Sequence, residues 1–261
     1  VTASGQTFTL TAGTESVTGT DGDDTISGVV SGLSSARTLD VKDVIDGGAG
    51  DDTANFSMKS SFAGFTTDSG SMTGVETVNL TNDTTIARSF DAANVTGVSQ
   101  YNIDAANGAV TLTSLIEAVN VSVSNQASGT FSMAFKDVAG TTKDVVGNDT
   151  DDALTVAFTN AGVMEDDATD ATERKEVTAT INDIEELTLD LTGENVIALG
   201  SNDGDKITVT GSGSLDMDTI STSTVSFDAS ALAGAVELDA MATTSTMTTL
   251  KTGAGDDEVL I

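Results

Sequence analysis

Short runs of alternating apolar and polar residues cover most of this 261-residue chain. The apolar positions hold mostly Val, Leu, Ile or Phe, and the residues between them are mostly Thr, Asn, Ser or Asp. A period of two predicts β-strands with one buried face. Turns rich in Gly, Asp, Asn and Ser separate the runs. The clearest expected strands are 77–80, 101–103, 110–112, 119–123, 154–156, 187–191, 207–209, 225–227 and 236–238.

No long segment carries the apolar stripe of a helix, and we expect residues 164–176 to be an exposed loop or a short solvated helix. Repetition favours a stacked architecture. Ile103, Leu112 and Val121 follow at intervals of nine residues. Coils of one strand each cannot bury an apolar face alone, so they would stack on their neighbours and share a core. Two groups of repeats agree: 90–97 (FDAANVTG) with 227–234 (FDASALAG), and 74–80 (GVETVNL) with 116–121 and 184–189.

The predicted fold class is therefore all-β, a parallel β-solenoid of the β-helix or β-roll type. The absence of Pro agrees with this prediction, because Pro would remove donors from the hydrogen-bond ladders of interior strands. An antiparallel β-sandwich with acidic loops is the alternative.

The charge of the chain restricts its partners. It has 41 Asp and Glu against 10 Lys and Arg, a net charge of −31. Such a surface repels nucleic acid and anionic lipid and favours divalent cations or basic partners. No run of about 18 apolar residues is present, so we expect no transmembrane segment.

The chain also lacks His and Cys, which excludes the usual zinc sites, Ser/His/Asp and Cys/His catalysis, and a disulfide framework. We expect no enzymatic activity. Adjacent carboxylates such as Glu185-Glu186 and Asp166-Asp167 leave a glycosidase pair open by residue type, and a solvated face or turn is the simpler interpretation.

Three Gly/Asp-rich turns match the calcium-binding nonapeptide G-G-x-G-x-D-x-U-x, in which U is apolar. Residues 47–55 (GGAGDDTAN) match throughout, with Ala54 as a small U; 19–27 (GTDGDDTIS) departs at the second position and 252–260 (TGAGDDEVL) at the first. Calcium takes six to eight oxygen ligands, and glycine permits the positive φ that turns carbonyl oxygens inward. Each match runs directly into an expected strand.

These turns hold the predicted calcium ligands. Asp24, Asp52 and Asp257 stand at the sixth motif position and are the expected carboxylate ligands. Plain acidic turns that bind no ion are the alternative. Weaker echoes at 147–152 and 203–205 fit either interpretation equally. Further candidates in the three turns are Asp21, Asp23, Asp46, Asp51, Asp256, Gly22, Gly50 and Gly255.

The order of these segments resembles a known family. Residues 7–13 (TFTLTAG), 19–26, 43–52 (DVIDGGAGDD) and 74–80 follow one another as in repeat-in-toxin-type surface-layer proteins of Gram-negative bacteria, which are exported by type I secretion. The resemblance covers about residues 5–105 and 222–261. Related motifs occur in calcium-dependent adhesins and biofilm-matrix proteins. The isolated motifs predict calcium clamps at particular turns and not a continuous array.

The resemblance implies an extracellular location at the bacterial cell surface, with folding that depends on external calcium. It also implies calcium-dependent self-association into a sheet or filament, and an anchor to lipopolysaccharide through another region. We therefore expect a structural surface-layer or matrix protein; a calcium-binding module of a large secreted adhesin is the alternative. The expected organisation is one solenoid over 1–261, a fragment of a longer chain, with a motif-rich start at 1–60, irregular coils at 61–251 and a further repeat beginning at 252–261.

Overall fold

The structure is a computed structural model that describes residues 4–66, 69–136, 152–164, 174–181, 184–200, 206–218, 220, 224–238 and 247–260. These residues form strands, turns and bends, and they contain no helix that could cross a membrane. The strands are β1 (Thr7–Thr9), β2 (Ser16–Thr20), β3 (Thr25–Val30), β4 (Val44–Gly48), β5 (Thr53–Met58), β6 (Ser71–Thr73), β7 (Thr77–Asn82), β8 (Arg88–Asp91), β9 (Gln100–Asp104), β10 (Val110–Leu115), β11 (Asn120–Ser124), β12 (Gly129–Phe135), β13 (Ala153–Thr159), β14 (Val177–Ile181), β15 (Glu186–Thr192), β16 (Glu194–Leu199), β17 (Lys206–Gly211), β18 (Ser214–Met217), β19 (Ser226–Leu232), β20 (Val236–Leu238), β21 (Thr249–Lys251) and β22 (Glu258–Val259).

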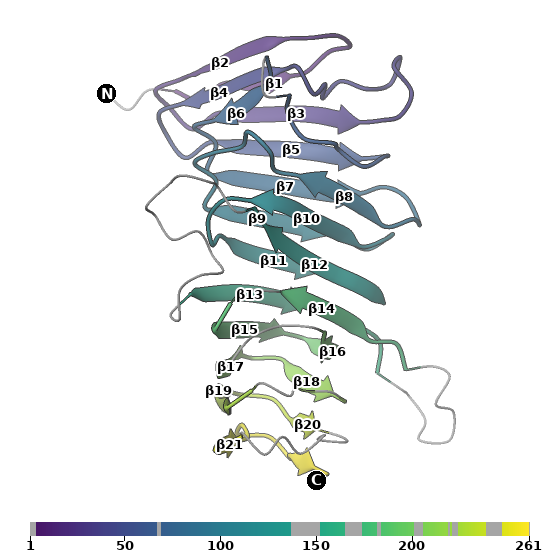
Figure 1. Cartoon of the computed structure of the whole chain (residues 1–261), viewed down its shortest axis with the longest axis vertical. Helices are drawn as coiled ribbons and strands as arrows, with labels where there is room; N and C mark the ends of the chain where they lie inside the picture. Colours follow the sequence, from purple (N-terminus) through teal and green to yellow (C-terminus); the bar gives the residue numbers. More distant parts are fainter. Residues whose placement is uncertain are drawn as a thin grey trace. The chain divides into compact units, whose positions relative to one another are not determined.

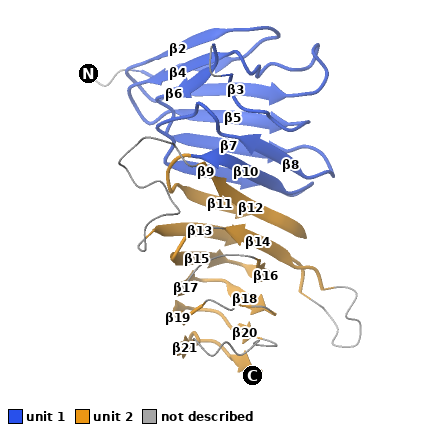
Figure 2. Ribbon diagram, viewed as in Figure 1, with its two compact units in different colours: residues 1–115 blue, residues 116–261 orange. Residues whose placement is uncertain are grey.

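The chain divides into two compact units, Val1–Leu115 and Ile116–Ile261 (Figure 2). In unit 1, strands β1-β3-β5-β7-β9 form one sheet in that order, and β2-β4-β6 and β8-β10 form two more (Figure 1). In unit 2, β11-β13-β15-β17-β19-β21 follow one another in one sheet and β12-β14-β16-β18-β20-β22 in another. The paired strands are parallel. The predicted parallel β-solenoid is confirmed, and the antiparallel sandwich is wrong.

One prediction about the coil is wrong, because a coil carries two strands and not one. Within unit 1, Ile103 lies on β9 and Leu112 on β10, in different sheets, so the nine-residue interval marks part of a coil. The number of residues in a coil varies. Residues that form hydrogen bonds between adjacent coils are, for example, 28 or 24 positions apart in unit 1 and 20 or 23 positions apart in unit 2. Two strands per coil let apolar side chains meet across the coil, which a single strand cannot do.

The core of unit 1 is built from the inward residues of these strands. Ile26, Ala54, Val78 and Tyr101 stack in register on successive strands and are almost fully buried. Phe90 of β8 lies across the coil from these strands. The centroid of its ring is 6.1 Å from that of Phe56 and 6.2 Å from that of Tyr101. Burying each such ring contributes about 1.5–3 kcal/mol. Burial also raises the pKa of Tyr101.

The two groups of internal repeats have different structural outcomes. The segments 74–80, 116–121 and 184–189 lead into β7, β11 and β15, all odd-numbered strands. Their similarity therefore marks equivalent positions in a coil. The segments 90–97 and 227–234 differ, because the first begins in β8 and the second begins in β19, and these strands belong to different sheets. Their common FDA sequence does not mark an equivalent position.

Candidate metal site at the stacked glycine and aspartate turns

The glycine and aspartate turns lie where the chain bends from one sheet into another. In unit 1, residues 21–24 join β2 to β3, 49–52 join β4 to β5, and 74–76 join β6 to β7. The register of β3, β5 and β7 places Thr25, Thr53 and Thr77 side by side, so the three turns stack on one edge. Two predicted motifs are thus brought together, while the third, between β21 and β22, belongs to unit 2.

Carboxylates of these turns bond to the backbone of the preceding coil. Asp52 Oδ1 accepts the Asp24 N–H at 2.6 Å, and Glu76 Oε2 accepts the Asp52 N–H at 2.7 Å. Asp24 Oδ1 accepts the N–H of Gln6. Each donor is the residue immediately before a strand of the β1-β3-β5 series. The carboxylates therefore satisfy backbone donors and tie successive coils together.

The same contact recurs in unit 2. Glu185 Oε2 accepts the Asp152 N–H at 3.1 Å. Asp257 Oδ1 makes a related bond in the other sheet, where it accepts the N–H of Val236, the first residue of β20, at 2.9 Å. Sequence reasoning missed the role of Glu76 and Glu185. The available signal was the Glu shared by the repeats 74–80 and 184–189, which precedes β7 and β15 in the same way.

The predicted ligands differ in exposure. Asp24 and Asp52 are 1% and 0% exposed, and Asp257 is half-buried. Asp23 Oδ1 accepts the Asp51 N–H at 3.0 Å, and Asp46 Oδ1 accepts the Gly48 N–H at 3.2 Å. Asp21, Asp23, Asp46 and Asp51 are exposed in unit 1, and Asp256 is exposed in unit 2.

Only some of the turn glycines have the positive φ that the motif predicts. Gly48 and Gly50 have φ of 100° and 137°, which favours glycine strongly at both positions. Gly22 and Gly255 are not left-handed. Gly22 is instead buried where the neighbouring turn approaches, since a Cβ on Gly50 would lie 2.8 Å from the Gly22 carbonyl carbon.

The buried aspartates Asp24 and Asp52 have opposite electrostatic environments. The backbone N–H of Thr20, bonded to Asp24 Oδ2, lowers the pKa of Asp24 against the opposing effect of burial. Burial raises the pKa of Asp52, and the charges of nearby acids add to this effect. The difference lies at the second oxygen: Asp52 Oδ2 is buried and has no hydrogen-bond partner. A buried carboxylate oxygen without a partner destabilises the folded state unless it is protonated or binds a cation.

The Gly74 carbonyl oxygen lies near this atom, and two further oxygens lie around Gly74. A Cβ built on Gly47 would lie 1.7 Å from the Gly74 carbonyl oxygen and 2.6 Å from Asp52 Oδ2. A Cβ built on Gly74 would lie 3.2 Å from Asp46 Oδ1 and 3.2 Å from the Gly48 carbonyl oxygen. Carboxylate and carbonyl oxygens are the ligands that calcium prefers, so the residues present fit such an ion.

Side chains alone do not form a metal cluster in the described ranges. Among them, no three or more His, Cys, Asp or Glu side chains are grouped as metal ligands. A cation at the stacked turns would therefore use main-chain oxygens together with carboxylates, as the glycine-rich sequence predicts. The weaker echo at 203–205 lies outside the described residues, as does the echo at 147–152 except for Asp152, whose N–H donates to Glu185.

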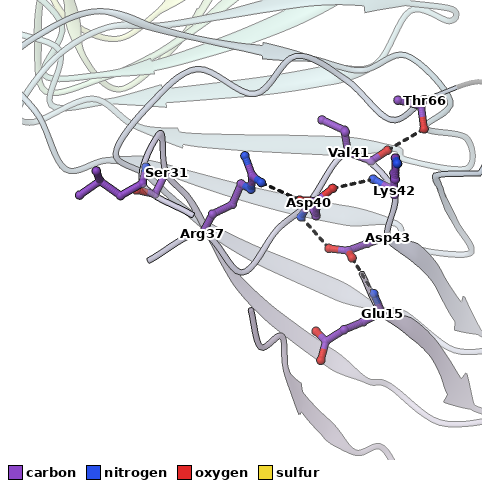
Figure 3. Close-up of polar contacts among 9 residues, drawn as sticks. Glu15, Ser31, Arg37, Asp40, Val41, Lys42, Asp43 and Thr66 are labelled. Atoms are coloured by element: carbon purple, nitrogen blue, oxygen red, sulfur yellow. Dashed lines mark hydrogen bonds and ion pairs between the residues drawn. The ribbon is translucent and has the colours of Figure 1, made fainter. Parts of the chain in front are cut away.

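Asp43 is a buried acid that sequence reasoning did not select as a ligand. Its Oδ1 accepts the Glu15 N–H at 2.8 Å and its Oδ2 accepts the Asp40 N–H at 2.7 Å (Figure 3). Asp40 also pairs with Arg37 at 3.0 Å. Burial raises the pKa of Asp43, although the two backbone bonds oppose the shift. Both oxygens have donors, so Asp43 fixes the loop before β4 to the residue preceding β2.

The adjacent glutamates considered for glycoside chemistry have structural partners. Glu185 accepts the Asp152 N–H, and Glu186 forms an ion pair with Lys206 on the next coil. Asp166 and Asp167, the other pair, lie outside the described residues.

Comparison with known protein families and curated proteins found no relative. No protein-family model matches the chain, and no curated protein matches it either. The fold defines the class as a parallel β-solenoid, and the function is argued from its turns.

Proposed function

We propose that this chain is a structural extracellular protein, a calcium-stapled β-solenoid that self-associates as a component of a bacterial surface layer or matrix. The observation that carries the proposal is the buried Asp52 Oδ2, which has no hydrogen-bond partner beside the Gly74 carbonyl oxygen. The turn sequences and the stacking of two matched motifs on one edge support the same conclusion.

Charge supplies the physical reason for a cation. The net charge is −31, and stacking brings the acids of turns 21–24 and 49–52 onto adjacent coils. Asp51 even donates its N–H to Asp23. Carboxylates this close repel each other when ionised, which opposes the folded state. A divalent cation removes this repulsion and gives Asp52 Oδ2 a partner.

In unit 1, the residues that would hold the ion are Asp46 and Asp52, with the main-chain oxygens of Gly48 and Gly74. Calcium would supply positive charge and cross-link two coils. At ten times its Kd, one ion bound only to the folded state adds roughly 1.4 kcal/mol. Three ions would add roughly 4 kcal/mol to a fold whose stability is typically about 5–15 kcal/mol. Calcium would therefore strongly shift the folding equilibrium.

The test combines stability with assembly. Circular dichroism would follow thermal unfolding of the purified chain in calcium, in chelator, and in magnesium at the same ionic strength. We expect calcium to raise the melting temperature well above the values in chelator and magnesium. Identical melting in calcium and chelator would contradict the calcium site.

Electron microscopy of the same samples would test the structural role. We expect sheets or filaments in calcium and dispersed particles in chelator. Calcium stabilisation of a chain that stays monomeric would contradict the surface-layer or matrix role and would favour the adhesin module.

A further inference from the structure

The outward face of the β1-β3-β5-β7-β9 sheet of unit 1 carries uncharged side chains except at its corner, where Asp104 at the end of β9 is in register with Thr81. We call this set the neutral array. Its members are exposed or half-buried, and none is ionisable, in a chain whose net charge is −31. The neutral array consists of Thr7, Thr9, Thr25, Ser27, Val29, Thr53, Asn55, Ser57, Thr77, Asn79, Thr81, Gln100 and Asn102.

Strand register makes the array regular in two directions. One row runs Thr7-Thr25-Thr53-Thr77, and the next runs Thr9-Ser27-Asn55-Asn79-Asn102. Neighbouring side chains are spaced about 4.8 Å across strands and about 6.7 Å along them. Because the rows follow the pleat of one sheet, the pattern is fixed by the backbone.

Contacts within the array make it rigid. Asn79 Nδ2 donates to Asn55 Oδ1 at 2.7 Å, and Asn102 Nδ2 donates to Asn79 Oδ1 at 2.9 Å. The Thr side chains are β-branched and stiff at χ1. A partner would therefore lose little binding energy to the ordering of this face.

The array is also hollowed. A groove of about 410 Å³ lies over it, lined by Thr9, Ser27, Asn55, Ser57 and Asn79 among others. Its lining residues include no acid and no base. The surroundings differ: Asp23 and Asp51 are exposed at the turns before β3 and β5, and Asp83, which accepts a hydrogen bond from Ser57, is exposed after β7. The array is an uncharged area with an acidic border.

We propose that the neutral array is a face through which a second copy of this chain packs in the assembly. The inference rests on the proposed self-association and names its contact surface. Two copies of charge −31 repel wherever their acids meet, and the array is a face on which they can approach without that cost.

A second copy also matches the array in geometry. It presents the same spacing across and along its strands, so its rows fit the first copy's rows in a two-fold arrangement. Side chains of this kind, including Asn ladders, interdigitate between facing sheets.

The size of the array sets the expected strength. Five strands and three rows cover roughly 300–400 Å². A stable complex buries about 800 Å² on each partner, so a single contact is weak. It gains strength when many copies repeat it in one assembly.

The experiment compares three variants of the full chain in calcium. Asn55→Asp places a charge at the array centre and keeps the oxygen that accepts from Asn79. Asn55→Ser changes the same position without charge. Ser16→Asp adds the same charge at an exposed position on β2, outside the array. Sedimentation velocity would give the concentration at which each assembles, and melting curves would verify folding.

We expect Asn55→Asp to raise the threshold concentration for assembly roughly tenfold or more, because the two facing copies then bring like charges together. Asn55→Ser and Ser16→Asp should assemble near the wild-type threshold. If folded Asn55→Asp assembles like wild type, or if Ser16→Asp is impaired equally, the inference is wrong and the proposed function stands. If wild type does not assemble in calcium, both are wrong. Binding of another molecule at this face, lost in Asn55→Asp while assembly is unchanged, also overturns the inference.

Discussion

Asp52 and Asp24 lie 28 positions apart in the chain and meet directly, with Asp52 Oδ1 accepting the Asp24 N–H at 2.6 Å. The same relationship links Glu76 to Asp52 one coil later, and Glu185 to Asp152 in unit 2. Carboxylates selected as candidate calcium ligands thus also join coils through the backbone. Asp52 has two oxygens for these two purposes, one bonded to Asp24 and one without a partner.

Substitutions of Asp52 should separate the two roles. Asp52→Ala leaves the Asp24 N–H without its acceptor, which should cost about 1–3 kcal/mol of unfolding free energy in chelator. Asp52→Asn keeps an acceptor oxygen and removes the buried charge, so it should remain near wild type in chelator. Both variants should lose part of the stabilisation by calcium. Urea unfolding in chelator measures the contribution of the bond to Asp24, and the difference between calcium and chelator measures the stabilisation by calcium. Equal losses for Ala and Asn in chelator would show that the link to Asp24 contributes nothing.

Gly47 should tolerate no side chain. A Cβ there would lie 1.7 Å from the Gly74 carbonyl oxygen, so Gly47→Ala forces the coils apart and should cost about 3 kcal/mol or more. Gly32→Ala is the matched control, because a Cβ at Gly32 has no heavy atom within 4 Å. The urea midpoints of the two variants give the comparison. A Gly47→Ala variant as stable as Gly32→Ala would refute the close stacking of these turns.

Asn82 should be a strong polar anchor of unit 1. Its side chain is fully buried and its Nδ2 donates to the Ile86 and Gly108 carbonyls, both at 2.9 Å. Asn82→Ala removes the donor to the Gly108 carbonyl and the acceptor of the Thr84 N–H, and we expect a loss of about 3 kcal/mol. Asn102→Ala, in the half-buried ladder, should cost less than about 1 kcal/mol. Hydrogen exchange should also accelerate around Ile86 in the Asn82 variant only. Equal losses at the two positions would contradict this ranking.

The pair of Asp228 and Lys251 should give a defined acid dependence. The hydrogen bond from Lys251 lowers the pKa of Asp228 to about 2, with further bonds from Ser230. A folded-state pKa below the unfolded value of 3.8 means that Asp228 contributes stability above about pH 4. That contribution is lost as the pH falls from about 4 to about 2. NMR titration of the Asp228 carboxyl carbon measures the shift directly.

Lys251→Met tests the cause of this shift. Removing the ammonium should raise the pKa of Asp228 toward its ordinary value and reduce the acid dependence of stability in that window. An unchanged Asp228 titration in Lys251→Met would assign the shift to Ser230 instead.

Much of the local structure could be predicted from sequence patterns. The run 77–80 became β7 and 187–191 lies within β15, because alternation of apolar and polar residues reports directly which face of a strand is buried. The turns at 21–24 and 49–52 were also predictable, since Gly and Asp favour tight bends between strands. The candidate ligands Asp24 and Asp52 were thereby assigned to turns, and their role as ligands stays a prediction.

Sequence patterns did not reveal the number of strands in each coil, the carboxylate links through Glu76 and Glu185, or the neutral array. Each depends on which coil meets which, and the partners of these contacts are 24 positions apart for Glu76 and 33 for Glu185. Because the coils differ in length, the sequence has no fixed repeat period from which these contacts could be predicted.

The sequence by itself determined strands, turns and the acidic, glycine-rich chemistry, because these follow from each residue and its near neighbours. Only the tertiary structure decided that Asp52 meets Asp24 and that Thr and Asn side chains form rows, because parallel register joins residues from separate coils.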